Sequence, residues 1–410
     1  MTKVLLITQW FDPEPTFKGL LFARELIGRG FQVEVLTGFP NYPGGKIYNG
    51  YKVRLLQKDM IDGVDIARVA LYPSHDRSVI RRLFNYASFS ISALFYGLFK
   101  AKRPDVIYAY HPPLTVGVVA VLLRVFRKIP VVYDIQDMWP DTLKATGIVK
   151  NKIVLRAISS LCDWVYRRVD KIVVLSPGFK ELLVTRSVKE SKIDVIYNWC
   201  SEEALGSSIA RKSVDFGAPE NFYILFAGNV GKAQGLDSIL GAAELLKTVA
   251  PELFFVILGG GIDIDRLKGI AEQRGIVNVL FLPPVPFDEV GSYLKSADAL
   301  LVHLKKDPLF SITIPSKTQA YMAAGRPILM AVDGDAANLV RRSECGLVAE
   351  SDNPESIAQA ALRLFSADSD TLADMAENGM RYYHEVLSIN IGSTKFSQLF
   401  ERLAHDRKEH

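Results

Sequence analysis

The sequence predicts an α/β protein with two doubly wound, Rossmann-like domains that face one another across a cleft. Three observations predict this fold class. The chain has 410 residues, more than one hydrophobic core usually serves, and 49% of them are hydrophobic, which is enough to fill two cores. Short β-rich runs alternate with longer amphipathic stretches, which is the pattern of parallel strands covered by crossover helices. The alternation stops once, at the charged, Gly- and Pro-containing stretch "RKSVDFGAPE", and then starts again.

The strand pattern divides the chain into two halves. In the first half, strands are predicted over residues 3–8, 31–37, 65–70, 105–110, 130–135, 171–176 and 193–198. In the second half, they are predicted over residues 222–228, 253–261, 279–285, 299–304 and 326–332. We place the boundary near residues 196–218, with one domain over residues 1–200 and a second domain over residues 201–385. Residues 386–410 are predicted as a helix that could cross back onto the first domain.

Composition narrows the function classes. A formal net charge of +4 is too small to indicate nucleic-acid binding, but it is compatible with phosphate-bearing ligands or an anionic membrane surface. The three cysteines, Cys162, Cys200 and Cys345, are scattered, so their spacing gives neither a disulfide framework nor a metal site. The opening residues "MTKVLLIT" run into a strand pattern rather than a signal peptide. We therefore expect a cytoplasmic protein without a metal, a cofactor or a nucleic-acid partner.

Two glycine-rich turns follow predicted strands of the second half. In "FAGNVGKAQGL", Gly228 lets the backbone approach a ligand, and Asn229, Lys232 and Gln234 supply side-chain donors beside it. Gly260 lies in the second run, "LGGG", one crossover later. We predict that both turns bind the donor. A turn needed only for packing would explain either run equally well.

The next two motifs carry less chemistry. Val285 lies among prolines in "FLPPVPF", where a stiff, extended backbone could read the edge of a flat heterocycle, or simply form a rigid turn. Asp263 and Asp265 form an Asp-x-Asp pair at a predicted helix start, which favours capping of that helix over metal binding.

A lysine without an obvious acidic partner stands in "PSKTQAYMAAGRPIL". Ser316 is predicted as the N-cap of a helix, with Lys317, Thr318 and Gln319 in its first turn. A helix N-terminus carries partial positive charge, so a cation is disfavoured there unless an anion arrives. The pattern predicts that Lys317 is catalytic and that Ser316, Thr318 and Gln319 bind the diphosphate donor. The alternative is a solvated surface lysine.

Candidate residues of the first half also follow predicted strands. Lys18 and Gly19 open a helix after a long loop that can reach the cleft, so we predict that they bind the acceptor. His111 stands at a strand end before two prolines, where an active-site histidine is favoured over a structural one. Asp137 follows the next strand and is placed to bind a polar ligand or act as a base.

An uncharged stretch, "LFNYASFSISALFYGLF" over residues 83–99, has basic residues at both ends. They are Arg77, Arg81 and Arg82 before it, and Lys100, Lys102 and Arg103 after it. The stretch is slightly short for a spanning helix. It is either a buried crossover helix or a surface helix whose aromatic residues enter the headgroup region, with Arg81 and Arg82 binding anionic lipid or a lipid diphosphate.

Six stretches together resemble bacterial family 4 glycosyltransferases of the GT-B fold, in particular the branch that builds O-antigen and capsule repeat units and includes N-acetyl-L-fucosamine transferases. The resemblance covers nearly the full length. It is carried by "TGFPNYPGGKIYNGY" (37–51), "YHPPLTVG" (110–117), "YDIQDMWPD" (133–141), "LSPGFKELL" (175–183), "FAGNVGKAQGL" (226–236) and "PSKTQAYMAAGRPIL" (315–329).

The resemblance implies transfer of a sugar, of the N-acetylated amino or deoxy kind, from a UDP-linked donor to a glycan on polyprenyl diphosphate. It implies retention of configuration and a peripheral location on the inner face of the cell membrane. The motifs "GNVGKAQG" and "PSKTQAYM" would hold the donor, with His111 beside the reacting sugar. The leaving diphosphate would accept the proton and Lys317 would stabilise its charge. If transfer inverts configuration, Asp137 is the expected base.

The sequence departs from the family pattern at two places. The family's glutamate pair, separated by seven residues, falls on Ile312 and Ala320. The arginine and lysine of its glycine loop fall near Asn229 and Gln234. Contacts to ribose and diphosphate are therefore expected from the helix turn that begins after Ser316.

Two other functions stay open on the sequence alone. A nucleotide-sugar 2-epimerase shares the two-domain architecture and a similar diphosphate site, but it needs no acceptor. A non-catalytic subunit that binds a glycan lipid is suggested by the missing glutamates.

Overall fold

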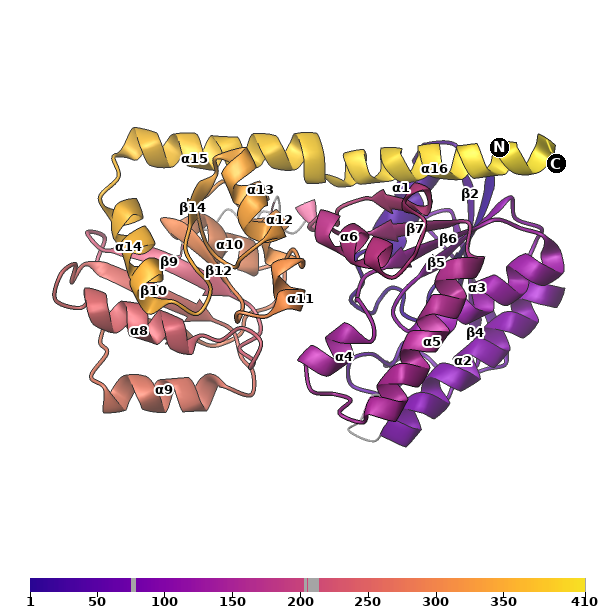
Figure 1. The fold of residues 1–410 in the computed structure, drawn as a ribbon, viewed down its shortest axis with the longest axis horizontal. Coiled ribbons are helices and arrows are strands. Elements are labelled where there is room, and N and C mark those ends of the chain that lie inside the picture. Colours follow the sequence, from indigo (N-terminus) through magenta and orange to yellow (C-terminus); the bar gives the residue numbers. More distant parts are fainter. Residues whose placement is uncertain (75–78, 203–204, 206–213, 410) are drawn as a thin grey trace. The chain divides into compact units, whose positions relative to one another are not determined.

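A computed structural model describes residues 1–74, 79–202, 205 and 214–409, which form two compact units (Figure 1). Unit 1 comprises Met1–Tyr197 and Ile389–His410, and unit 2 comprises Asn198–Ser388. Each unit holds one β-sheet with helices packed against it. Within the expected boundary region of 196–218, residues 203–204 and 206–213 lie outside the described part of the chain. The α/β class with two Rossmann-like sheets is confirmed.

The sheet of unit 1 has eight strands in the order β3-β4-β2-β1-β5-β6-β7-β8. All neighbours pair in parallel except β3 and β4. Its strands are β1 (Lys3–Ile7), β2 (Gln32–Gly38), β3 (Leu56–Ile61), β4 (Val64–Val69), β5 (Val106–Tyr110), β6 (Val131–Ile135), β7 (Lys171–Val174) and β8 (Ile193–Val195). The helices are α1 (Leu20–Gly28), α2 (Val79–Phe99), α3 (Leu114–Arg127), α4 (Asp141–Ala145), α5 (Lys152–Arg168), α6 (Pro177–Thr185), the short η1 (Glu190–Lys192) and α16 (Ile389–Glu409).

The sheet of unit 2 has six parallel strands in the order β11-β10-β9-β12-β13-β14. They are β9 (Phe222–Ala227), β10 (Leu253–Leu258), β11 (Val279–Leu282), β12 (Ala299–His303), β13 (Ile328–Ala331) and β14 (Gly346–Val348). The helices are α8 (Asp237–Leu246), α9 (Ile264–Gln273), α10 (Val290–Ser296), α11 (Pro308–Ser311), α12 (Lys317–Ala324), α13 (Asp335–Ser343), α14 (Pro354–Phe365), α15 (Ser369–Tyr382) and the π-helical η3 (Tyr383–Leu387).

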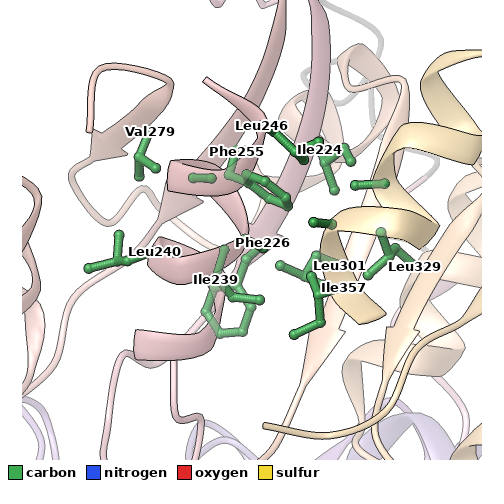
Figure 2. Close-up of a cluster of buried hydrophobic side chains, with 14 of the residues drawn as sticks. Ile224, Phe226, Ile239, Leu240, Leu246, Phe255, Val279, Leu301, Leu329 and Ile357 are labelled. Carbon is green, nitrogen blue, oxygen red and sulfur yellow. The ribbon is translucent and has the colours of Figure 1, made fainter. Parts of the chain in front are cut away.

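The core of unit 2 shows why these segments are strands and helices. The strands are nearly continuous apolar runs because helices cover both faces of a parallel sheet. Phe226 from β9, Phe255 from β10 and Leu301 from β12 are fully buried together with Ile357 from α14 (Figure 2). Burial of this apolar surface is the main favourable term in folding the unit.

The last helix, α16, packs on unit 1. Its Phe396 is fully buried, with ring centroids 5.1 Å from Phe22 and 5.4 Å from Tyr108. Arg29 in the C-cap of α1 donates to the Asn390 side chain at 2.6 Å. The chain therefore returns to its first unit after completing the second.

Every predicted strand is present, but two strands were missed. The edge strand β3 alternates exposed and half-buried residues, so it lacks the apolar run by which the others were recognised. Its hairpin with β4 turns at Asp62 and Gly63, both with positive φ, and an Asp-Gly pair is a strong hairpin signal that could have revealed it. The strand β14 has only three residues.

Candidate functional site

Each sheet has one point where the strand order reverses. In unit 1 this switch point lies between β1 and β5, and in unit 2 it lies between β9 and β12. The crossovers on either side of such a point run in opposite directions, which opens a crevice beyond the carboxyl ends of the strands. Ligands of open α/β sheets bind in that crevice, so each unit has one candidate site, and the two are described separately.

The turn after β9 is built mainly by its own backbone. The Gly228 amide donates to the Leu258 carbonyl at 2.9 Å, and the Val230 amide donates to the Gly260 carbonyl at 2.8 Å. The Gly231 amide donates to Gln234 Oε1 at 3.1 Å. These three amides hold the turn in shape and cannot also bind a phosphate. A donor contact from this turn would therefore have to come from its other groups, and the predicted role of the turn stays a prediction.

The second glycine run is a packing turn. A Cβ atom on Gly259 would lie 2.0 Å from the Gly228 carbonyl oxygen, and one on Gly261 would lie 2.2 Å from the Val230 carbonyl oxygen. Both glycines also have positive φ, of 142° and 157°. Gly260 has more room, since a Cβ there would meet nothing nearer than Pro284 at 3.6 Å. The run lets the turns after β9 and β10 lie against each other, so the packing alternative explains it.

Lys317, the first residue of α12, turns its ammonium group into unit 2. The Nζ atom lies 3.5 Å from the centroid of the Phe226 ring, and a Cβ on Gly228 would be 3.4 Å from it. The atom is sealed from solvent and has no hydrogen-bond partner among the described residues. Burial lowers the pKa of Lys317 to about 7. The solvated surface lysine is therefore the wrong alternative.

This environment makes Lys317 sensitive to an anion. A cation above an aromatic face gains some stabilisation, but burial without a hydrogen bond or a counter-charge costs more, which is why the pKa falls. An anion bound beside Nζ would supply both the hydrogen-bond acceptor and the charge that the protein lacks there. Lys317 therefore has the chemistry to stabilise a phosphoryl oxygen that reaches its ammonium group.

The other residues at the start of α12 behave differently from prediction. Ser316 has helical φ and ψ of −59° and −23°, and its hydroxyl makes no capping bond, because a capping side chain requires an extended backbone. Thr318 is fully buried with its Oγ1 sealed and unpartnered among the described residues. The buried Gln319 amide, oriented to satisfy its neighbours, donates to the Ser316 and Pro315 carbonyls at 3.0 and 3.1 Å. The Thr318 hydroxyl is thus sealed in the same way as Lys317 Nζ, and the donor-binding role of Thr318 and Gln319 stays a prediction.

The remaining donor candidates lie at the surface of unit 2. Asn229 and Lys232 are exposed in the turn after β9, and Gln234 is half-buried there. Val285 is half-buried in the segment after β11, two strands away from β9. Asp263 does not cap α9 with its side chain; its carboxylate pairs with Arg266 at 3.3 Å instead. Among the described residues, no group of three or more His, Cys, Asp or Glu side chains could hold a metal ion.

His303 is a residue that sequence reasoning missed. It ends β12 at the switch point and is fully buried. Its Nδ1 lies 2.5 Å from the Gln234 carbonyl, which can only accept, and its Nε2 accepts from the Asp352 amide at 3.4 Å. Burial lowers the pKa of His303, so the ring is neutral, with the proton on Nδ1. His303 therefore fixes the glycine turn to the sheet. A polar residue that ends an apolar strand at a switch point was the available signal.

In unit 1, the carboxyl ends of four neighbouring strands present a row of polar and aromatic residues. The strands β2, β1, β5 and β6 are consecutive in the sheet. Tyr42, Trp10, His111 and Asp137 follow them in the same order. Neighbouring strands are about 5 Å apart, so the row spans roughly 15 Å. The structure thus brings His111 and Asp137 onto one edge, as the sequence predicts.

His111 is held among aromatic rings. It is 2% exposed, and its ring meets Trp139 and Tyr133 edge-on at 5.3 and 5.9 Å. Burial lowers its pKa to about 3, and its Nδ1 has no partner in the described part of the chain. His111 is therefore neutral at physiological pH, and it can act through hydrogen bonds but not as a cation.

Asp137 and Asp134 have different environments. Burial raises the pKa of Asp137, whose carboxylate makes no ion pair among the described residues. Asp134 is fully buried; it pairs with Lys18 Nζ at 3.2 Å and accepts from the Tyr108 hydroxyl at 2.5 Å. Asp137 is the carboxylate that a ligand could use.

The expected acceptor role of Lys18 does not fit this geometry. Its side chain is fully buried and its ammonium group is engaged by Asp134. Gly19 packs against Asp12, whose Oδ2 would lie 2.0 Å from a Cβ at position 19 and caps α1 by accepting from the Leu20 amide at 2.6 Å. These residues anchor the first turn of α1.

Arg81 and Arg82 lie in the first turns of α2. Arg81 is exposed and Arg82 is half-buried. Tyr86, one turn further along, is half-buried, and the charge of Arg82 acts on its hydroxyl. Both arginines thus lie near the start of a helix that contains no acidic residue.

Two Rossmann-like sheets in one chain, each with polar residues at its switch point, define the GT-B architecture of glycosyltransferases. Comparison with protein families agrees with this class: residues 20–199 match the Glycosyl transferase 4-like domain, and residues 210–382 match the Glycosyl transferases group 1 domain. The chain is a glycosyltransferase, with a glycosyl transferase 4-like domain followed by a group 1 domain.

Relatives and solved structures agree with this assignment. The chain is 28% identical over 337 residues to a protein of Escherichia coli (strain K12) named as the colanic acid biosynthesis glycosyl transferase WcaI, covering 79% of this chain and 81% of WcaI. It is 25% identical over 298 residues to Pseudomonas aeruginosa WbjE, a glycosyltransferase by name, covering 71% and 74%. The Anabaena protein HepE, solved in complex with UDP and glucose, has the same fold, with a TM-score of 0.67, 15% identity, and coverage of 98% of this chain and 100% of HepE.

Proposed function

We propose that this glycosyltransferase moves a sugar from a UDP-linked donor held by unit 2 to a polyprenyl-diphosphate-linked glycan held by unit 1, in the synthesis of a bacterial surface polysaccharide. One observation carries the donor half of the proposal: the buried ammonium group of Lys317, which has no hydrogen-bond partner among the described residues and lies beside the switch point of unit 2. The name of WcaI supports the polysaccharide, and the ligands of HepE support a uridine nucleotide.

The proposed chemistry follows from the charge that develops during transfer. As the sugar leaves, negative charge accumulates on the diphosphate, and Lys317 is positioned to stabilise it from a site that excludes water. We propose that configuration is retained, with the leaving diphosphate accepting the proton of the attacking hydroxyl. His111, neutral and buried, would position the sugar through hydrogen bonds. Asp137 takes the role of base only if configuration is inverted.

The experiment replaces Lys317 by methionine, which keeps the length and apolar contacts of the side chain. A thermal-shift screen of nucleotide sugars first identifies the donor, because a ligand of the folded state raises the melting temperature. Turnover of that donor by Lys317→Met should fall by roughly two to three orders of magnitude, the size typical of removing one donor to a developing oxyanion. Lys268→Met, an exposed lysine of the same unit, is the matched control. Unchanged turnover in Lys317→Met would remove this lysine from the mechanism.

The same assay separates the competing functions. A transferase converts the donor only when an acceptor is present, apart from slow hydrolysis. Conversion of the nucleotide sugar to its 2-epimer without acceptor would instead identify an epimerase. Calorimetry that finds no nucleotide affinity would point to a binding subunit. The anomeric configuration of the product, read by NMR, decides between retention and inversion.

We also propose that α2 rests on the inner face of the membrane. Five large apolar residues follow one face of this helix, each between 60% and 70% exposed: Ile80, Phe84, Ile91, Phe95 and Phe99. The helix contains no acidic residue and carries Arg81 and Arg82 near its start. An apolar stripe with cations and without acids fits anionic lipid. Among the described residues, no helix is long and apolar enough to cross a bilayer, so the helix would lie on the surface.

Sedimentation with vesicles tests the membrane proposal. Vesicles that contain anionic lipid should bring down the wild-type protein, and Arg81→Glu/Arg82→Glu should release most of it. Arg167→Glu/Arg168→Glu, at the exposed end of α5 in the same unit, makes an equal change of charge and should stay bound. Equal co-sedimentation of both variants would count against docking through α2.

A further inference from the structure

A stacked aromatic pair stands at the carboxyl edge of the unit 1 sheet. The rings of Trp10 and Tyr42 lie 4.4 Å apart with an interplanar angle of 25°. Trp10 follows β1 and Tyr42 follows β2, which are neighbouring strands beside the switch point. Both residues are half-buried. We call this pair the Trp10–Tyr42 platform.

A buried carboxylate holds the platform in place. Glu14 is 2% exposed, and its Oε1 accepts from the Asn41 and Tyr42 amides, both at 2.7 Å. Its Oε2 accepts from the Phe11 amide at 3.2 Å. Glu14 thus ties the loop after β1 to the loop after β2. Burying a carboxylate is costly unless it is well hydrogen-bonded. The backbone amides of the two loops supply these hydrogen bonds, and the loops are thereby held in place.

The helix α2 is joined to the same two loops. Gln9, beside Trp10, donates to Asn85 Oδ1 at 2.5 Å, and Asn85 Nδ2 lies 3.4 Å from Asn41 Oδ1. Asn85 also donates to the Tyr72 carbonyl at 2.7 Å. These contacts fix the first half of α2 beside the platform. The arginine-bearing start of the helix is therefore next to the aromatic pair.

Three kinds of side chain now lie along one edge. Asp137 lies on the same carboxyl edge as the platform, after β6, which is two strands away from β1. Arg82 lies one turn before Asn85 on α2, and Asn85 contacts Asn41, the residue before Tyr42. Along the edge, Asp137 is followed by His111 and then by the aromatic pair, and α2 contacts the loops that carry this pair.

This order matches the chemistry of one class of ligand. A pyranose ring has an apolar C–H face, which packs on aromatic rings. Its hydroxyl groups donate hydrogen bonds to carboxylates. A diphosphate prefers arginine, and a prenyl chain prefers apolar surface. We propose that the Trp10–Tyr42 platform binds the sugar of a prenyl diphosphate-linked acceptor, that Asp137 accepts a hydrogen bond from its hydroxyl, and that Arg82 holds its diphosphate. This inference deepens the proposed function and rests on its lipid-linked acceptor.

The experiment compares ligands with and without a sugar. The probes are N-acetylglucosaminyl and galactosyl diphosphates on a ten-carbon prenyl chain, and geranyl diphosphate, which lacks the sugar. Calorimetry with the full chain should show that the wild-type protein binds at least one sugar-bearing probe more tightly than geranyl diphosphate. Trp10→Ala should weaken binding of that probe about 10-fold or more, as expected when an aromatic anchor is truncated. The affinity of this variant for geranyl diphosphate should equal that of the wild-type protein. Arg82→Ala should weaken the binding of all the probes.

Two further variants keep the test independent of folding. Trp10→Phe and Tyr42→Phe retain an aromatic face and should keep most of the preference for the sugar. Every variant should bind UDP as the wild-type protein does, because the donor site is in unit 2. Equal affinity of the wild-type protein for sugar-bearing and sugar-free probes would overturn the platform proposal, and so would a full sugar preference in Trp10→Ala. If the wild-type protein does not bind UDP, the proposed donor site is overturned instead.

Discussion

Proton uptake by Lys317 is a direct test of the donor site. The pKa of this buried lysine is about 7 in the ligand-free protein, so about a tenth of the molecules carry the charge at pH 8. A diphosphate within hydrogen-bond distance should raise the pKa of Lys317 by about 1 to 3 units. Binding at pH 8 should therefore take up about 0.4 to 0.9 proton per molecule. At pH 6 the lysine is already about nine-tenths protonated, so uptake should be about 0.1 or less.

The assay is isothermal calorimetry with UDP-glucose in buffers of different ionisation enthalpy. This ligand has no titrating group between about pH 6 and 8, so the slope of observed enthalpy against buffer enthalpy counts the protons taken up by the protein. Lys317→Met should show a slope near zero at pH 8, whereas Lys268→Met should match the wild-type protein. Tight binding by the wild-type protein without proton uptake at pH 8 would refute the assignment of Lys317 to the diphosphate.

Stability should show the same titration with a definite sign. The folded-state pKa of Lys317 lies below its unfolded value of 10.5, so between about pH 7 and 10.5 the unfolded chain binds more protons. The free energy of unfolding of the wild-type protein, relative to Lys317→Met, should therefore rise with pH through this window, by up to about 1.4 kcal/mol per pH unit.

Two further predictions concern residues that support the sites. His303→Phe leaves the Gln234 carbonyl without its donor and should raise the dissociation constant of UDP-glucose about 5- to 10-fold, the effect of one lost buried hydrogen bond. His384→Phe, at an exposed position, is the control and should leave this constant unchanged. Equal affinities of the two variants, measured by calorimetry, would contradict a positioning role for His303. Lys18→Met leaves Asp134 buried without its cation and should lower the free energy of unfolding, measured in urea, by about 3 kcal/mol or more. The double variant Lys18→Met/Asp134→Asn should recover part of this loss. If Lys18→Met unfolds like the wild-type protein, the ion pair contributes little to stability.

Much of the fold could be read from local pattern. Strands that are buried on both faces, such as β5, β6, β9 and β12, appear as short apolar runs, and such runs are visible without knowledge of their partners. Position relative to a strand end also has a local signature, so His111 and Asp137 could be assigned to the carboxyl edge. An edge strand such as β3, which is half exposed, lacks this signature.

The environment of each side chain was decided only by the tertiary structure. Lys18 and Lys317 look alike in sequence, since each opens or precedes a helix after a loop. Lys18 meets Asp134 inside unit 1 and becomes half of an ion pair. Lys317 lies against the Phe226 ring, and among the described residues its ammonium group has no hydrogen-bond partner. Spacing along the chain cannot show this difference, because the partners lie 116 and 91 residues away (134 − 18 and 317 − 226). The sequence by itself determined which segments form the buried strands and which residues follow the ends of those strands, because local propensity and periodicity encode those features. Only the packing of distant segments determined which charged and aromatic groups face a ligand, because burial and pairing depend on neighbours that are remote in the chain.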